Sequence, residues 1–179
     1  TLGHGLLALG GANSYSLGGY ENTPLEEVLP VSMDTPPDRE RQQVAILLMV
    51  DHSASMYDPN RQNSKLELAK GGALAVTEIL ASDDQVGVLI FDTRQTWTVP
   101  FQRLGEGLAL SEIQDRIRAI DYGGGTDIYN ALGIGLSELS RQDAPVRHAL
   151  LLTDGRSYGN DEQYQRLVDS ARANGITLS

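Results

Sequence analysis

Cysteine is absent from all 179 residues of the sequence. A chain without cysteine cannot form a disulfide, hold a metal ion through thiolates or use a cysteine nucleophile in catalysis. The absence excludes these kinds of chemistry. It does not indicate a cellular compartment, because a protein without thiols is compatible with both reducing and oxidising surroundings.

Positively charged residues are also few. The sequence has 14 lysines and arginines against 24 aspartates and glutamates, which gives a formal net charge of -10. Phosphates of nucleic acids and anionic membrane surfaces repel such a chain. We therefore expect no nucleic-acid partner, and we expect basic partners or cations to suit the chain better.

Long hydrophobic runs are missing as well. The longest run, Val44 to Val50, is far shorter than the roughly 18 to 20 apolar residues that cross a bilayer. A leucine-rich patch at Leu6 to Leu9 lacks the basic flank and the apolar length of a secretory signal. We expect no membrane insertion by this chain, which begins at Thr1 rather than Met and which we interpret as a piece of a longer protein.

Glycine and proline distribution divides the chain into two regions. Residues 1–43 contain two Gly-Gly pairs and the proline-containing segment "NTPLEEVLPVSMDTPPDRERQQ", a composition typical of turns. We expect an irregular N-terminal arm there, although a simple linker or chain end fits the same pattern. Residues 44–179 are numerous enough to bury one hydrophobic core, so we expect a single domain.

Within residues 44–179, short apolar runs alternate with segments of helical periodicity. This alternation is typical of a parallel sheet with helices on both faces. Continuous apolar runs at 44–50, 86–91 and 149–153, with a weaker run at 176–179, predict strands that are buried on both sides. The predicted fold is α/β, with a doubly wound, mostly parallel sheet that lacks its last strand and helix in this fragment.

Residues 96–101, "TWTVPF", have a different pattern. Apolar and polar residues alternate, which places Trp97, Val99 and Phe101 on one side of a predicted strand. Pro100 has no amide proton to donate, so this strand should lie at an edge of the sheet.

Capping residues and periodicity indicate the helices. Ser64 and Glu67 form an S-x-x-E capping box before apolar residues at helical spacing as far as Leu80. Ser111 and Gln114 predict the start of a second helix.

Two more helices complete the pattern. Asp127 precedes periodic apolar residues between Ile128 and Leu139, and we interpret it as a helix cap rather than as support for a neighbouring site. We expect Asp161 to cap the last helix. Asn174 and Gly175 should end that helix, because glycine readily adopts the left-handed conformation.

Oxygen-bearing side chains occur at the ends of two predicted strands and before a predicted helix. Asp51, Ser53 and Ser55 follow one strand, Asp154 follows another, and Thr126 comes after three glycines that allow close backbone approach. In a doubly wound sheet, ligands bind beyond the carboxyl ends of the strands, where successive connections leave in opposite directions. We expect all five side chains to meet at that edge.

Carboxylate and hydroxyl oxygens suit a hard divalent cation. Mg²⁺ and Mn²⁺ favour octahedral coordination by oxygen, at roughly 2.0 to 2.1 Å for Mg²⁺. Neutral hydroxyl ligands would leave the ion with much of its charge, so an anionic group from elsewhere could complete its shell. We predict Mg²⁺ or Mn²⁺ as the bound ion, with Ca²⁺ as a further candidate, and we predict no catalytic residue.

The segments "DHSAS", "GGGTD" and "LLTDG" resemble the metal-ion-dependent adhesion site of von Willebrand factor type A domains, over about residues 44–179. The resemblance implies a Rossmann-like fold in which Ser53 and Ser55 bind the cation directly, Thr126 binds directly or through water, and Asp51 and Asp154 act mostly through water. It also implies a binding module, not an enzyme, whose exposed cation captures an acidic side chain of a partner protein.

The segment "ALGGANSYSLGGYENTPLEEVLPV" of the arm is similar to part of bacterial membrane proteins that combine a glutamine amidotransferase-like region with a von Willebrand factor type A domain. This resemblance implies a membrane-associated parent protein, while the sequence leaves the localisation of this fragment unknown. It does not imply glutaminase activity, because the chain has no cysteine nucleophile.

Other functions fit parts of the pattern. The trio at Asp51, Ser53 and Ser55 taken alone also fits a helix-capping turn. A magnesium-dependent phosphoryl hydrolase could use Asp51 as nucleophile, although haloacid-dehalogenase-type hydrolases have a second acid where Ser53 stands. A scaffold with a purely structural cation is another alternative. An exposed sheet edge, left by a missing strand, predicts possible self-association.

The remaining polar candidates are interpreted as structural. His52 should point away from the oxygen site, and His4 and His148 have no evident acid or nucleophile beside them. Asp92 is predicted to be a turn residue.

Overall fold

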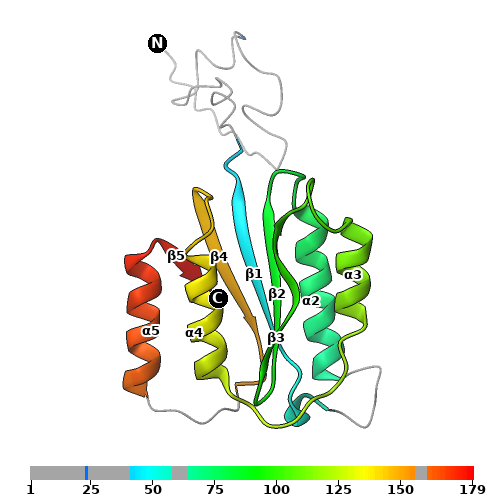
Figure 1. Ribbon diagram of the computed structural model, residues 1–179, viewed down its shortest axis with the longest axis vertical. Coiled ribbons are helices and arrows are strands. Elements are labelled where there is room, and N and C mark those ends of the chain that lie inside the picture. The colour runs from blue at the N-terminus through cyan, green and yellow to red at the C-terminus, as the bar shows by residue number, and fades with distance from the viewer. Residues whose placement is uncertain (1–22, 24–40, 58–63, 156–160) are drawn as a thin grey trace, which may run out of the picture. The chain divides into compact units, whose positions relative to one another are not determined.

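A five-stranded sheet with helices on both faces is the framework that positions the site (Figure 1). The computed structural model describes residues 23, 41–57, 64–155 and 161–179. The predicted arm, residues 1–43, lies almost entirely outside the described residues. The fold below is that of the unit Gln42–Ser179.

Strands and helices follow one another along the chain in the predicted order. The strands are β1 (Val44–Asp51), β2 (Gln85–Phe91), β3 (Gln95–Arg103), β4 (Val146–Leu152) and β5 (Ile176–Leu178). The helices are the short 3₁₀ turn η2 (Ala54–Met56), α2 (Lys65–Ile79), α3 (Leu110–Arg118), α4 (Ile128–Leu139) and α5 (Asp161–Ala173).

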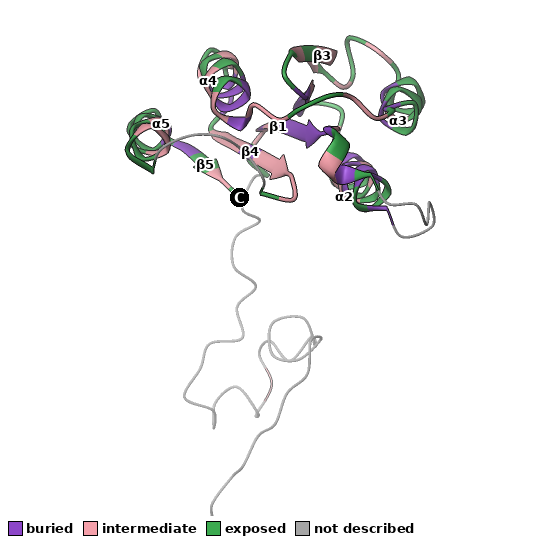
Figure 2. Ribbon diagram, turned by 90° about the horizontal axis from the view of Figure 1, so that it is seen from below, coloured by how far each residue is buried: buried purple, intermediate pink, exposed green. Residues whose placement is uncertain are grey.

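The strand order β3-β2-β1-β4-β5 places β1 in the middle of the sheet. β1 runs parallel to β2 and β4, β5 runs parallel to β4, and β3 is antiparallel to β2. The chain leaves β1 through α2 on one face and enters β4 from α4 on the other face (Figure 2). The prediction of a doubly wound, mostly parallel sheet with residues 96–101 at an edge is therefore confirmed.

β1 is buried on both sides because both faces of the sheet are covered (Figure 2). Leu47 and Met49 pack into the cluster formed with α4 and α5, whereas Leu48 and Val50 pack into the cluster formed with α2 and α3. Two covered faces explain the continuous apolar run. Each fully buried side chain of this kind stabilises the fold by about 1.5 to 3 kcal/mol.

The edge strand β3 departs from regular alternation. Trp97 and Phe101 pack on the α4 side of the sheet, with ring centroids 5.7 Å apart, but Val99 is buried on the α2 and α3 side. Register shifts flank the pairing of Val88 with Val99. Because each bulge turns the following side chain to the opposite face, the prediction that Val99 shares a side with Trp97 and Phe101 is wrong.

Side-chain caps and one glycine fix the ends of three helices. Ser64 Oγ accepts a hydrogen bond from the amide of Glu67 at 3.1 Å before α2, and Asp127 Oδ1 accepts one from the amide of Asn130 at 3.1 Å before α4. The predicted caps at Ser64 and Asp127 are confirmed. Asp161, which was predicted to cap the last helix, is instead the first residue of α5. After α5, Gly175 has a φ of 67°, the left-handed conformation that was expected to end this helix.

The start of α3 differs from its prediction. Its first residue is Leu110, and Ala109 occupies the cap position without a side-chain hydrogen bond, so the predicted start at Ser111 is wrong. Ile113 and Ile117 are fully buried, and the amide of Ile113 donates to the carbonyl of Ala109 at 3.1 Å. Burial of the isoleucine face therefore sets the first turn of α3, and a capping side chain does not.

Candidate metal centre

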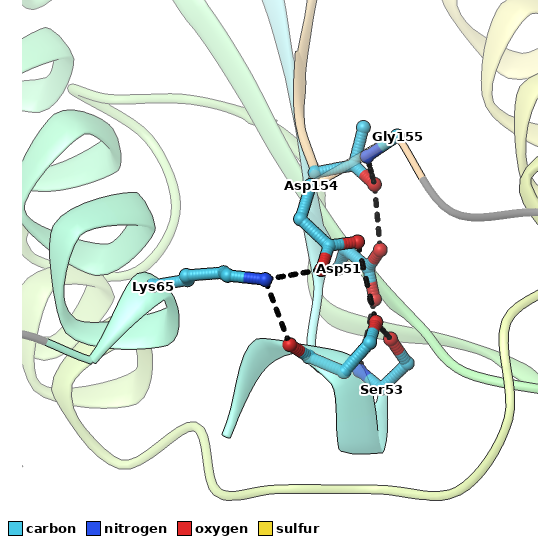
Figure 3. Close-up of polar contacts among 7 residues, drawn as sticks. Asp51, Ser53, Lys65, Asp154 and Gly155 are labelled. Carbon is cyan, nitrogen blue, oxygen red and sulfur yellow. Dashed lines mark hydrogen bonds and ion pairs between the residues drawn. The ribbon is translucent and has the colours of Figure 1, made fainter. Parts of the chain in front are cut away.

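Asp51, the last residue of β1, is fully buried and both of its carboxylate oxygens accept hydrogen bonds. Oδ1 accepts the amide of Ser53 at 2.9 Å, and Oδ2 accepts the hydroxyl of Thr153 at 2.6 Å. The Thr153 hydroxyl oxygen in turn accepts the amide of Gly155 at 3.1 Å. Hydrogen bonds to Asp51 therefore link the loop after β1 to the loop after β4 (Figure 3).

Three side-chain oxygens form a row beside this link. Ser53 Oγ lies 3.1 Å from Ser55 Oγ, and Ser55 Oγ donates to Asp154 Oδ1 at 3.2 Å. Ser53 is fully buried, and the side chain of Asp154 is 8% exposed. The row joins residues 99 positions apart in sequence, as expected where the carboxyl ends of β1 and β4 meet.

Lys65, the first residue of α2, contacts the same row (Figure 3). Its Nζ lies 2.7 Å from Asp154 Oδ2 and donates to the carbonyl oxygen of Ser55 at 3.2 Å. The sequence motif does not include Lys65. The cap at Ser64 was the available signal, because a helix that directly follows β1 begins at the carboxyl edge of the sheet.

The glycine loop after α3 lies against the β1 loop. The amide of Ala54 donates to the carbonyl of Gly124 at 2.7 Å, and the amide of Gly123 donates to the carbonyl of His52 at 2.6 Å. A Cβ on Gly123 would lie only 2.6 Å from a ring carbon of His52, so the approach requires glycine. Thr126 lies two residues beyond this contact and is half-buried. The loop brings it toward the same edge, but the hydrogen-bonded row does not include it.

Asp92 supports the glycine loop from the end of β2, a role that sequence analysis missed. It is buried, and its Oδ2 accepts the amide of Gly124 at 2.9 Å while its Oδ1 accepts the amide of Arg94 at 2.6 Å. Burial raises the pKa of the Asp92 carboxyl, but the amides of Gly124 and Arg94, with the charges of His52 and Arg94, outweigh burial and lower this pKa below 3.8. The predicted turn is present, and its carboxylate also orders a neighbouring loop.

The histidines of the described chain make structural contacts. His52 Nδ1 lies 2.8 Å from the carbonyl oxygen of Asp121. His148 bridges Thr177 Oγ1 and Ser179 Oγ at 2.6 and 2.8 Å, which ties β4 to β5. Neither histidine makes a hydrogen bond to the oxygen row.

The donor set fits a hard divalent cation. In an octahedron with oxygens about 2.1 Å from the ion, neighbouring oxygens are about 3.0 Å apart. The separations of 3.1 and 3.2 Å along Ser53, Ser55 and Asp154 are close to this value. Among the described residues, no group of three or more His, Cys, Asp or Glu side chains could hold a metal ion, so a site here depends on the serine hydroxyls.

Known proteins resemble this chain in sequence and in fold. The profile of the von Willebrand factor type A domain matches residues 46–156. The protein sll0103 of Synechocystis sp. is 31% identical over 140 residues, which are 77% of this chain and 31% of that protein.

Two solved structures extend the comparison. An aerotolerance-related membrane protein from Bacteroides fragilis has a TM-score of 0.63 at 21% identity, covering 75% of this chain and 65% of its own. Proximal thread matrix protein 1 from the mussel byssus, solved with a zinc-occupied metal-ion-dependent adhesion site (MIDAS) motif, has a TM-score of 0.58 at 19% identity, covering 76% and 37%. This chain thus spans less than two thirds of each of these proteins. The match over residues 46–156 includes more than half of the chain, which therefore belongs to the von Willebrand factor type A domain family.

Proposed function

We propose that this domain is a divalent-cation-dependent protein-binding module. In this proposal Asp51, Ser53, Ser55, Thr126 and Asp154 hold Mg²⁺ or Mn²⁺ and present it to an aspartate or glutamate of a partner protein. The supporting observation is the row from Ser53 Oγ through Ser55 Oγ to Asp154 Oδ1, with steps of 3.1 and 3.2 Å. These separations match the spacing of neighbouring oxygen ligands around a hard cation.

Asp51 and the two serines of the row would have different roles. Asp51 orients the serine loop through the amide of Ser53 and supplies a buried negative charge. Ser53 and Ser55 offer neutral oxygens. A bound divalent cation would supply positive charge that attracts a partner carboxylate. Because the chain has a net charge of -10, an acidic partner would be repelled without that local positive charge.

The position of Asp51 argues against the hydrolase alternative. Its carboxylate is fully buried, and both oxygens already accept hydrogen bonds from Ser53 and Thr153. A nucleophile must approach the reacting phosphorus atom, which this carboxylate could do only after losing these contacts. We therefore propose a binding role without catalysis.

We also propose that the parent protein is membrane-associated. The Bacteroides fragilis structure with this fold comes from a protein described as a membrane protein. In the described part of this chain, no helix has the length and hydrophobicity needed to cross a membrane. The amidotransferase-like parent remains a prediction.

Titration calorimetry of the full chain with MgCl₂ and MnCl₂ tests the metal site. The wild type should release or absorb heat of binding, and it should gain about 2.7 kcal/mol of stability at a free metal concentration of 100 times Kd. The double variant Ser53→Ala, Ser55→Ala should lose both effects. Ser111→Ala, Ser170→Ala removes two exposed serine hydroxyls elsewhere and should bind like the wild type. A wild type that binds neither ion contradicts the proposal.

A further inference from the structure

The ammonium group of Lys65 lies beside a carboxylate that would also attract the proposed metal ion. Its Nζ lies 2.7 Å from Asp154 Oδ2, whereas Asp154 Oδ1 accepts the hydroxyl of Ser55 (Figure 3). The carboxylate is therefore shared between a member of the oxygen row and an ammonium group. The Lys65 side chain is 45% exposed and the Asp154 side chain is 8% exposed, so the lysine reaches inward from the surface.

Helix stability does not explain a lysine at this position. Lys65 is the first residue of α2, and the positive end of the helix dipole disfavours a cation in the first turn. Its two described polar contacts are to Asp154 and to the carbonyl of Ser55, both outside α2. The position is better explained by the charge of the site, where Asp51 and Asp154 place two carboxylates at one edge of the sheet.

An ammonium group and a divalent cation compete for the same carboxylate. The negative charge of Asp154 stabilises both cations. The two cations also repel each other, and this repulsion is strong because the site is partly desolvated. Lysine is suited to such exchange, because its ammonium is a point charge on a flexible four-carbon stem that can move into solvent.

We propose that Lys65 is an internal competitor of the metal ion, which neutralises Asp154 in the metal-free domain and lowers the metal affinity of the site. This inference rests on the proposed function, because it presumes that the oxygen row binds a divalent cation. Entry of the ion breaks the contact between Lys65 and Asp154. The concentration of metal at which the site fills is therefore set by this lysine together with the ligands.

The test is titration calorimetry of the full chain with MnCl₂. Lys65→Met removes the charge, and Lys65→Gln removes the charge but keeps a hydrogen-bond donor. Both variants should bind Mn²⁺ at least about tenfold more tightly than the wild type, because the competing charge is gone. Arg141→Met is the matched control, since it removes one cation from an exposed ion pair with Glu138 and should leave the affinity unchanged.

Thermal unfolding supplies a second measurement. Without metal, Lys65→Met should unfold at a lower temperature than the wild type, because Asp154 loses a paired cation. With saturating Mn²⁺ this difference should disappear or change sign. A metal-independent difference would contradict the competition.

The outcomes separate this inference from the proposed function. Equal or weaker Mn²⁺ binding by both Lys65 variants, with clear binding by the wild type, overturns the competition and leaves the metal site in place. Clear binding by the wild type, with tighter binding by both Lys65 variants, supports both. If the wild type and all variants fail to bind Mn²⁺, both the proposed function and the role of Lys65 are contradicted.

Discussion

The hydroxyl of Thr153 donates a hydrogen bond of 2.6 Å to the buried carboxylate of Asp51, and this contact joins the ends of the adjacent strands β1 and β4. The same hydroxyl oxygen accepts the amide of Gly155. Thr153 therefore orders both loops that carry the proposed ligands, although it is not one of the five predicted ligand residues.

Replacing Thr153 with valine tests this link. Valine has a similar shape but no hydroxyl, so Asp51 Oδ2 would lose its donor inside the protein, at a cost of about 1 to 3 kcal/mol. Urea denaturation should show this loss, and Thr153→Ser should be close to the wild type. Equal stability of the valine variant and the wild type would show that the contact is not important.

Gly123 and Gly133 should respond oppositely to substitution by alanine. A Cβ on Gly123 would lie 2.6 Å from His52 and 2.7 Å from Asp92 Oδ2, so the loop must shift, and we expect a loss of about 1 to 3 kcal/mol. Gly133 lies inside α4, where a Cβ would meet no atom of another element within 4 Å, and alanine there should stabilise the helix by about 0.5 to 1 kcal/mol. Paired thermal melts measure both. A Gly123→Ala variant as stable as the wild type would contradict the tight approach.

Asp92 should make stability depend on pH in the acid range. Its pKa is lowered below 3.8 in the folded state, so its stabilising contribution is complete above that pH and is lost as the pH falls through the lowered pKa. Asp92→Asn lacks this titration. The stability difference between wild type and variant should therefore be largest near neutral pH and should shrink in strongly acidic solution. A difference that is constant with pH would contradict the assignment.

The free edge of β5 should allow self-association. In the described part of the chain, β5 pairs only with β4. Ser179 uses both its amide and its carbonyl to bond β4, so the neighbouring Leu178 directs its amide toward the open edge. Sedimentation velocity should show concentration-dependent dimers, and Leu178→Pro should reduce them by removing this donor. A wild type that stays monomeric at high concentration rules out edge pairing.

Much of this architecture could be predicted because local signals were strong. The apolar run of β1 reflects burial on both faces, and the caps at Ser64 and Asp127 act within one turn of their helices. The side of Val99 could not be predicted, because the bulges that turn it depend on pairing with β2.

The candidate site was only partly predictable for the same reason. Strand-end positions indicated that Asp51, Ser53, Ser55 and Asp154 would meet at one edge, where their contacts now lie. Contacts from side chains outside the motif, such as that of Lys65 with Asp154, could not be predicted from the sequence, because they depend on the three-dimensional path of the chain. A sequence pattern shows which oxygens are available, but it does not show which cations already lie beside them.

Crystals of the full chain grown with MnCl₂ give the most direct test of the central claim. We predict an anomalous manganese peak within bonding distance of the hydroxyl oxygens of Ser53 and Ser55, slightly beyond the roughly 2.1 Å typical of Mg²⁺, with Lys65 moved away from Asp154. The contradicting result is an anomalous map with no peak at these hydroxyls at saturating manganese, while the contact between Lys65 and Asp154 remains in place.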